Sequence, residues 1–380
     1  MRLLVPLTDA FGGRGGIAQF NRDLLRALCV HPDVERVTAI PRVMPDAPGE
    51  YPRALDYRTE AVGGKGAYLR TVAHRVWTGA YEGVICGHIH LLPIAWLAAR
   101  RAGVPLLLIV HGIEAREPSD KWLANQLVPR VDAFVSVSGR TKEQLVGWSG
   151  VEAGKGRVVP NCIDRSRFGP GDRPAYLQDR YGLHDRPVIL TLGRLPVQEK
   201  RKGHDEVLEV LPRLAKEVPD LTYLVCGDGA DRSRLEAKAE RLGVADRTIF
   251  AGYIPEDEKA DHYRVADAFV MPGRTEGFGI AYLEALACGV PVVASSADAS
   301  REAVRNGKLG TVVDPDDPED VKAGILAALR EPHGVPEGLD YFSVERFRER
   351  WHDVVDMCFR GKASTRTAGQ KKTRFAESDP

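Results

Sequence analysis

Short apolar runs rich in β-branched residues alternate along the chain with longer amphipathic stretches. This alternation is typical of parallel β-strands joined by crossover helices, so it predicts an α/β fold built from βαβ units. The expected strands are residues 2–8, 34–41, 83–87, 105–111, 133–138 and 157–160 in the first half, and residues 187–193, 221–226, 248–253, 268–272, 291–295 and 310–313 in the second. The clearest helical patterns cover residues 17–29, 203–216, 231–242, 257–266 and 279–288. The chain is therefore expected to form two doubly wound parallel sheets in series, each binding ligands at the carboxyl ends of its strands.

The periodic pattern breaks over residues 164–186, where glycine, proline and charged residues replace it. A chain of 380 residues is longer than one hydrophobic core usually supports, so we expect two domains linked at this break, with a site in the cleft between them. Helical periodicity returns over residues 343–358. Residues 361–380 have no apolar periodicity, which indicates a disordered tail.

The charge of the chain is balanced, with 53 Lys and Arg against 53 Asp and Glu. No global field would therefore draw the protein to nucleic acid or to an anionic membrane. The 6 cysteines are scattered and never spaced as C-x-x-C, which predicts neither a disulfide framework nor a zinc site. The sequence opens without a secretory signal pattern, and no apolar stretch is long enough to span a bilayer, so we expect a cytoplasmic location.

Residues 65–77 are a local exception, because they interleave Lys65, Arg70 and Arg75 with aromatic and aliphatic side chains. A basic, aromatic helix of this kind suits peripheral contact with the anionic inner face of a membrane. A surface helix that covers the core has the same composition, so both interpretations stay open.

The strongest chemical signal is TEGFGIAYLEALACGVPVVAS at residues 275–295, in which Glu276 and two glycines stand between an expected strand and an expected helix. Free backbone N–H groups at the start of such a helix, together with the positive end of its dipole, can hold a diphosphate. Glu284 lies at most about 12 Å further along the helix axis. Because the carboxyl pair of a glycoside hydrolase flanks a single bond, we interpret these two glutamates as contacts along an elongated ligand.

Two cations stand near the first strand of the second sheet: Arg194 follows VILTLG, and Lys202 precedes the next helix. Fixed cations at this edge would stabilise the charge on a departing pyrophosphate more than they stabilise the ground state. This interpretation requires no metal. The alternative treats the basic string QEKRKGHD as a solvated surface loop.

Three other patterns have simpler explanations than metal or dinucleotide binding. Asp314-Pro315-Asp316 has the D-x-D form of a metal clamp, but its context predicts a turn and a helix start. His88 and His90 follow a strand without a third ligand, so we expect no metal there. The glycine-rich turn at residues 11–20 lacks the full G-x-G-x-x-G spacing, which weakens a dehydrogenase interpretation.

Residues 255–304 resemble the C-terminal signature of glycosyltransferase family 4, the group 1 retaining glycosyltransferases, with the E-x7-E motif at Glu276 and Glu284. Three further segments match the family in its expected order, namely residues 11–20, LLLIVHGIE at 106–114 and LTLGRLPVQEKRKGHDEVL at 190–208. The resemblance implies a GT-B fold, in which two Rossmann-like domains face each other across a cleft. It implies an acceptor domain of residues 1–165 with a returning helix at 345–360, and a nucleotide-sugar donor domain of residues 166–344.

The resemblance also implies roles for the matched residues. Glu276 would contact hydroxyls of the transferred sugar, Glu284 the ribose, and His111 the donor sugar beside the developing positive charge. Glu276 and His111 are thus the residues implied in catalysis. The other implied donor-binding residues are Gly15, Gly16, Arg194, Lys202, Ile254, Gly277, Phe278, Gly279 and Ile280. The chain departs from the family at Gly273, where serine or threonine is commoner, and at residues 298–302, which lack a glycine-rich turn.

We accordingly expect a retaining hexosyltransferase that uses a nucleotide-diphosphate sugar, either a UDP-sugar or GDP-mannose. The acceptor would be a glycan, a lipid-linked saccharide or a small-molecule hydroxyl in polysaccharide or glycoconjugate biosynthesis. Neither a cofactor nor a metal is expected, and no nucleic acid partner. Two alternatives remain open: a catalytically silent nucleotide-sugar-binding subunit, and an NAD-dependent dehydrogenase that would bind nicotinamide at residues 11–20.

Overall fold

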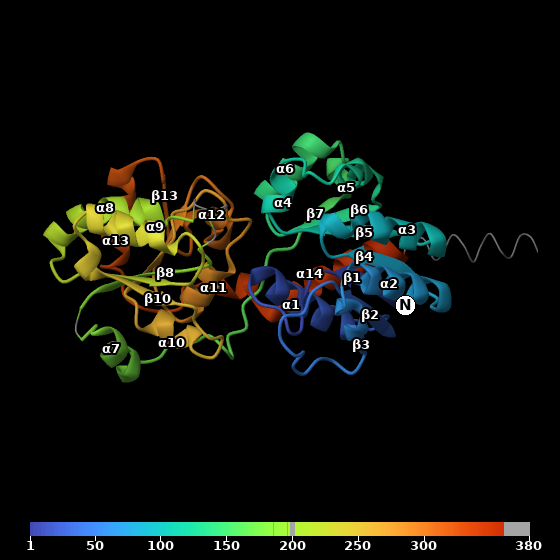
Figure 1. Ribbon diagram of the computed structural model, residues 1–380, viewed down its shortest axis with the longest axis horizontal. Helices are drawn as coiled ribbons and strands as arrows, with labels where there is room; N and C mark the ends of the chain where they lie inside the picture. Colours follow the sequence, from blue (N-terminus) through green and yellow to red (C-terminus); the bar gives the residue numbers. More distant parts are fainter. Residues whose placement is uncertain (185, 196, 198–201, 361–380) are drawn as a thin grey trace, which may run out of the picture. The chain divides into compact units, whose positions relative to one another are not determined.

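A computed structural model describes residues 1–184, 186–195, 197 and 202–360 (Figure 1). The chain divides into two compact units: Met1–Val159 with the described residues from Glu345 to Arg360, and Pro160–Val344. Each unit has its own parallel sheet. The tail expected to be disordered, residues 361–380, lies outside the described residues.

The first unit contains a 7-stranded sheet in the order β3-β2-β1-β4-β5-β6-β7. Its strands are β1 (Arg2–Leu7), β2 (Arg36–Pro41), β3 (Leu55–Tyr57), β4 (Gly83–Cys86), β5 (Leu106–Val110), β6 (Ala133–Ser136) and β7 (Gly156–Val158). Its helices are α1 (Gly16–Cys29), α2 (Lys65–Thr78), α3 (Leu92–Ala102), α4 (Ile113–Arg116), α5 (Trp122–Leu127), α6 (Gly139–Ser149) and α14 (Val344–Val355). All neighbouring strands run parallel. The strand order reverses between β1 and β4, which is where open α/β sheets bind ligands.

The second unit contains a 6-stranded sheet in the order β10-β9-β8-β11-β12-β13, again parallel throughout. Its strands are β8 (Val188–Leu192), β9 (Thr222–Cys226), β10 (Thr248–Gly252), β11 (Ala268–Val270), β12 (Val292–Ser295) and β13 (Thr311–Val313). Its helices are α7 (Ala175–Tyr181), α8 (His204–Glu217), α9 (Arg232–Arg241), α10 (Lys259–Arg264), α11 (Ile280–Ala287), α12 (Ser300–Ala303) and α13 (Pro318–Ala328). The order reverses between β8 and β11. The prediction of two doubly wound parallel sheets is confirmed.

The segment expected to link the domains, residues 164–186, lies inside the second unit, which begins at Pro160. Arg173 of this segment donates hydrogen bonds to the Val265 carbonyl at 2.6 Å and to the Asp267 carboxylate at 3.2 Å. The loss of periodicity in the sequence therefore marks a segment that side-chain hydrogen bonds fasten to the second unit.

Helix α14 returns to the first unit and completes its core. Trp351 is 0% exposed, and its ring lies 6.2 Å from that of Phe20 on α1. Phe347, one helical turn earlier, lies 5.5 Å from the same Phe20 ring. These apolar positions recur at helical spacing, so one face of α14 is buried. The periodicity at residues 343–358 thus belongs to a helix that stabilises a unit formed mainly by the first part of the chain.

Helix α2 contains the basic, aromatic segment at residues 65–77. Its inward face is formed by Tyr68, Val72 and Val76, all buried. Its outward face leaves Trp77 70% exposed and Leu69 50% exposed. The Arg101 guanidinium of α3 lies 5.2 Å from the centre of the Trp77 ring. None of the described helices has the length and apolarity needed to cross a membrane.

Candidate functional site

Glu276 lies in the loop between β11 and α11, where both its backbone and its side chain are held in place. Its N–H donates a hydrogen bond to the Asp298 carboxylate at 2.9 Å, and its C=O accepts one from the Ala299 N–H at 3.2 Å. Its carboxylate pairs with Lys202 Nζ at 2.6 Å, and the Lys202 and Glu276 side chains are only 15% and 13% exposed. Because water has little access, this pair is screened less than a surface ion pair.

The start of α8 brings Lys202 to this position. Gly203 has a φ of 92°, and a Cβ there would lie 2.7 Å from the Pro272 nitrogen. Only glycine therefore lets α8 begin so close to the end of β11. Burial lowers the pKa of His204 to about 4, so the imidazole of His204 is neutral near pH 7. Arg194 follows β8 and is exposed, and residues 198–201 of the expected basic loop lie outside the described residues.

The N-terminus of α11 is formed by the expected residues Gly277, Phe278, Gly279 and Ile280. Gly279 has a φ of 89°, and a Cβ there would lie 2.6 Å from the Tyr282 ring, so this position requires glycine. Phe278 is 3% exposed and its ring lies 5.6 Å from that of Phe342, which anchors the loop in the core. N–H groups in the first turn of a helix lack intrahelical partners, so an anion is favoured there.

Glu284 lies on α11 and is 5% exposed. Its Oε2 accepts a hydrogen bond from the Tyr263 hydroxyl at 2.7 Å. Burial, followed by the charge of Glu284, raises the pKa of Tyr263 well above its ordinary value, so this hydroxyl remains a donor. Burial lowers the pKa of Lys259, but the carboxylates of Glu284 and Glu256 outweigh burial and raise it. An ionised Glu284 is thus supported by a hydroxyl and a nearby cation.

In the first unit, His111 follows β5, and its ring is fixed on two sides. Its Nε2 donates a hydrogen bond to the Gly87 C=O at 3.0 Å, because a carbonyl oxygen can only accept. The Phe20 ring meets the imidazole edge-on at 5.0 Å. With the proton on Nε2, Nδ1 of the neutral ring is left as an acceptor. The backbone N–H of His111 donates to the Glu114 carboxylate.

Gly15 and Gly16 are exposed at the N-terminus of α1. Gly15 has a φ of 85°, and a Cβ there would meet nothing within 4 Å, so the backbone conformation rather than the space favours glycine. The preceding turn is fastened by Arg22, which donates to the carbonyls of Ala10 at 3.0 Å and Gly13 at 2.9 Å. The glycine loop is therefore a defined turn that ends in a helix N-terminus.

The D-x-D string lies between β13 and α13. Asp316 pairs with Arg274 at 2.7 Å, and Asp314 accepts a hydrogen bond from the Asp316 N–H at 3.0 Å. Asp317 caps α13 by accepting from the Glu319 N–H at 2.9 Å. These acidic residues thus form a turn, an ion pair and a helix cap.

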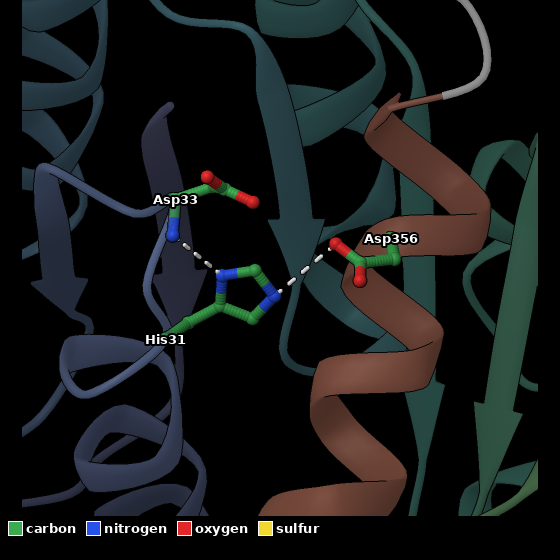
Figure 2. Close-up of side chains that lie close together, drawn as sticks. All are labelled: His31, Asp33 and Asp356. Carbon is green, nitrogen blue, oxygen red and sulfur yellow. Dashed lines mark hydrogen bonds and ion pairs between the residues drawn. The ribbon is translucent and has the colours of Figure 1, made fainter.

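The candidate ligand atoms of His31, Asp33 and Asp356 lie within 4.8 Å of one another, as a metal site requires (Figure 2). His31 Nδ1 accepts a hydrogen bond from the Asp33 N–H at 3.1 Å, which leaves the ring proton on Nε2, facing Asp356 at 3.3 Å. A metal would need a lone pair on that Nε2. Arg360 also pairs with both aspartates. We therefore interpret the group as an ion-pair network that fastens the segment after α14 to the first unit.

The structure brings Lys202, Glu276 and the N-terminus of α11 together in the second unit, with Glu284 further along the same helix. Ile254 follows β10 and is 6% exposed. His111, Gly15 and Gly16 belong to the first unit. Tyr263 and Asp298 could not be recognised as site residues from the sequence alone. The departure of residues 298–302 from the family's glycine-rich turn was the sequence feature that could have indicated Asp298. No sequence feature indicated Tyr263, because a tyrosine in an amphipathic helix is common.

Comparisons with known proteins identify the family to which the chain belongs. A family model described as Glycosyl transferases group 1 matches residues 177–342, and one described as Glycosyltransferase Family 4 matches residues 14–167. A GDP-mannose-dependent alpha-(1-6)-phosphatidylinositol monomannoside mannosyltransferase of Mycolicibacterium smegmatis is 37% identical over 63% of this chain and 65% of its own length. A D-inositol 3-phosphate glycosyltransferase of Acidothermus cellulolyticus is 32% identical over 76% of this chain and 68% of its own length. The chain spans between 56% and 65% of the length of the first relatives that it matches.

Solved structures show the same fold. The Anabaena HepE protein in complex with UDP and glucose matches with a TM-score of 0.69 at 20% identity, covering 97% of this chain and 100% of that one. A sucrose-phosphate synthase from Thermosynechococcus elongatus matches with a TM-score of 0.69 at 19% identity, covering 99% and 100%. Two Rossmann-like parallel-sheet units of this kind define the α/β GT-B class. The chain belongs to the group 1 glycosyltransferases of glycosyltransferase family 4.

Proposed function

We propose that this chain is a retaining hexosyltransferase that uses a nucleotide-diphosphate sugar and glycosylates a hydroxyl of a glycan, a lipid-linked saccharide or a small molecule. The observation that carries this proposal is the 2.6 Å ion pair between Lys202 and Glu276, in the loop that leads into α11. A cation and a helix N-terminus suit the diphosphate, and a carboxylate suits the sugar hydroxyls.

In the proposed reaction, the bond between the anomeric carbon and the donor phosphate breaks while the bond to the acceptor oxygen forms on the same face. The departing phosphate oxygen takes the proton of the acceptor hydroxyl, so no separate protein base is needed. Lys202 and Arg194 stabilise the charge that develops on the pyrophosphate. Glu276 orients the sugar and Glu284 the ribose, while His111 stabilises the positive charge near the anomeric carbon.

The first donors to test are GDP-mannose, which appears in the name of the Mycolicibacterium relative, and UDP-glucose, the sugar nucleotide related to the ligands of the Anabaena structure. Because a ligand that binds only the folded form raises the melting temperature, thermal unfolding with a panel of nucleotide sugars tests donor binding. We expect a clear shift with one nucleotide base, unchanged by EDTA because no metal is required. A shift with nicotinamide dinucleotides alone would support the dehydrogenase alternative.

Replacing Tyr263 with phenylalanine is expected to raise the KM for the donor by about five- to tenfold with little change in kcat. The physical reason is that Glu284 loses the hydroxyl that orients it, so ribose binding weakens in the ground state and the transition state alike. Steady-state kinetics at varied donor concentration measures both constants.

Tyr223→Phe is the matched control, because the Tyr223 hydroxyl is equally buried but bonds to Thr191 at 2.8 Å. Its donor KM should equal that of the wild type even if its stability falls. The role given to Tyr263 is wrong if both variants show the same donor KM.

We also propose that α2 and α3 rest on an anionic membrane, as a lipid-linked acceptor would require. Arg70, Arg100 and Arg101 are exposed there, together with Trp77 and Leu97. Arg75 pairs with Glu60 at 3.6 Å and is therefore a weaker contributor. A mixed basic and apolar surface of this kind binds anionic headgroups at low ionic strength.

Arg70→Ala is expected to weaken binding to phosphatidylglycerol vesicles about fivefold at low salt, since each basic residue near an anionic surface contributes about 1 kcal/mol. Cosedimentation measures this partition, and binding should fall as the salt concentration rises. Arg241→Ala, an exposed cation of α9 in the second unit, is the control and should bind like the wild type. Failure of the wild-type protein to sediment with these vesicles would rule out the membrane proposal.

A further inference from the structure

The Asp298 side chain is built into the donor-site loop of the second unit. It lies between β12 and α12 and is only 1% exposed. One carboxylate oxygen accepts a hydrogen bond from the Glu276 N–H at 2.9 Å, and the other accepts one from the Ser300 N–H at 2.9 Å. The next residue, Ala299, donates its N–H to the Glu276 C=O at 3.2 Å. Residues 298 and 299 therefore hold both backbone polar groups of Glu276.

The loop that carries Asp298 is itself braced by buried serines. Ser300 Oγ accepts a hydrogen bond from the Ser295 N–H at 3.0 Å, and Ser295 Oγ accepts one from the Ala297 N–H at 3.0 Å. Both serines are 0% exposed. The loop that carries Asp298 is thus held by its own buried hydrogen bonds, and the Asp298 carboxylate bonds directly to the Glu276 backbone.

The charged and titratable groups around Asp298 do not neutralise it. They are the Glu276 carboxylate after β11, which pairs with Lys202 before α8, and the Tyr282 phenol on α11. Among the described residues, no cation forms an ion pair with Asp298. Burial raises the pKa of Asp298 to about 6, the nearby Glu276 charge adds to this, and the hydrogen bonds from Ser300 and Glu276 oppose it.

We propose that Asp298 is a positioning residue whose ionised carboxylate sets the orientation of Glu276 and so controls donor binding. This inference rests on the proposed glycosyltransferase function. Asp298 is not itself a catalytic residue, because it acts through the Glu276 backbone. Asp298 opens the string DASRE, the segment that departs from the glycine-rich turn of the family pattern.

The chemistry of the contact makes it sensitive to pH. The carboxylate accepts from two N–H donors, so both of its oxygens must be acceptors. A protonated carboxyl group has one hydroxyl oxygen, which is neutral and a poorer acceptor than a carboxylate oxygen, so the hydrogen bonds from these N–H groups weaken. Donor binding should therefore be strong above about pH 6 and should weaken as the pH falls through that value.

The stability of the protein should change in the opposite direction to donor binding as the pH falls. The folded pKa of about 6 lies above the ordinary value of 3.8, so the folded state binds the proton more tightly than the unfolded chain. By linkage, the ionised carboxylate destabilises the folded state, and this destabilisation has its full size above about pH 6. It decreases as the pH falls below 6 and is absent below about 3.8. As the pH falls, protonation of Asp298 should therefore raise the stability of the protein and weaken donor binding at the same time. A residue with only a structural role would not give this combination.

The test uses Asp298→Asn, which keeps the shape of the side chain but cannot offer two acceptor oxygens. We expect its donor KM to rise about ten- to a hundredfold through misplacement of Glu276, and we expect the acid decline near pH 6 to disappear from its pH profile. We also expect the wild type to gain melting temperature relative to Asp298→Asn as the pH falls from 7 to 5. Asp317→Asn is the matched control, because Asp317 also accepts from a backbone N–H, that of Glu319, but does not contact Glu276.

The outcomes separate this inference from the proposed function. Donor binding by the wild type, with an unchanged donor KM and pH profile in Asp298→Asn, would overturn the positioning role alone. No binding of any nucleotide sugar by the folded wild type would overturn the proposed function and this inference together. A raised donor KM in Asp298→Asn with a wild-type value in Asp317→Asn supports the positioning role.

Discussion

Replacing Lys202 with methionine is expected to lower kcat for sugar transfer by about a hundred- to a thousandfold. Lys202 Nζ lies 2.6 Å from Glu276 in a region with little access to water, so its charge is fixed before the reaction begins. The charge on the departing pyrophosphate grows as the glycosidic bond breaks, so a fixed cation stabilises the transition state more than the ground state. Steady-state kinetics should show a much larger loss in kcat than in donor affinity.

Lys322→Met is the matched control for this variant. Lys322 lies on α13 and pairs with Glu217 at 3.2 Å, away from the residues assigned to the donor. Removal of its charge should leave kcat unchanged. A Lys202→Met enzyme that retains wild-type kcat would show that the leaving group does not depend on this cation.

Replacing Trp351 with alanine is expected to lower the free energy of unfolding of the first unit by about 3–5 kcal/mol. Trp351 is 0% exposed and packs on Phe20 of α1, so its removal leaves a cavity between α14 and the unit it completes. In thermal unfolding, the melting temperature should fall by on the order of 10 °C.

Trp77→Ala provides the comparison, because it deletes the same side chain at a position that is 70% exposed. Its melting temperature should change little, since surface substitutions usually alter stability by less than about 0.5 kcal/mol. Equal losses in the two variants would mean that α14 is not part of the cooperative core of the first unit.

The sequence predicted the central strands well because each is buried in its sheet and therefore forms a short apolar run. Residues 187–193 correspond to β8 (Val188–Leu192), and residues 279–288 correspond to α11 (Ile280–Ala287). It did not predict β3 (Leu55–Tyr57), which has only 3 residues and pairs with β2 through its backbone. So short a segment carries no periodic pattern, and its neighbours in space decide its conformation.

In the candidate site, too, the sequence indicated residues that belong to one short motif but not the partners that lie far away along the chain. The E-x7-E motif and the glycines of its loop are local, so the sequence indicated Glu276 and Gly279 directly. The partner of Glu276 is 74 residues away at Lys202, and that of Glu284 is Tyr263, 21 residues away. Only the packing of α8 and α10 onto the sheet brings these groups together. Asp298 was seen as a departure from the family pattern, but its hydrogen bond to Glu276 depends on the folded loop.

The most direct test of the central claim is the anomeric configuration of the product, measured by proton NMR after incubation with the nucleotide sugar that stabilises the protein and a panel of polyol and saccharide acceptors. We expect the sugar to be transferred with the donor's configuration retained and one nucleoside diphosphate to be released for each sugar transferred. Lys202→Met should nearly abolish both. An inverted product, or a donor that binds tightly and is never consumed with any acceptor, would contradict the proposed retaining transfer.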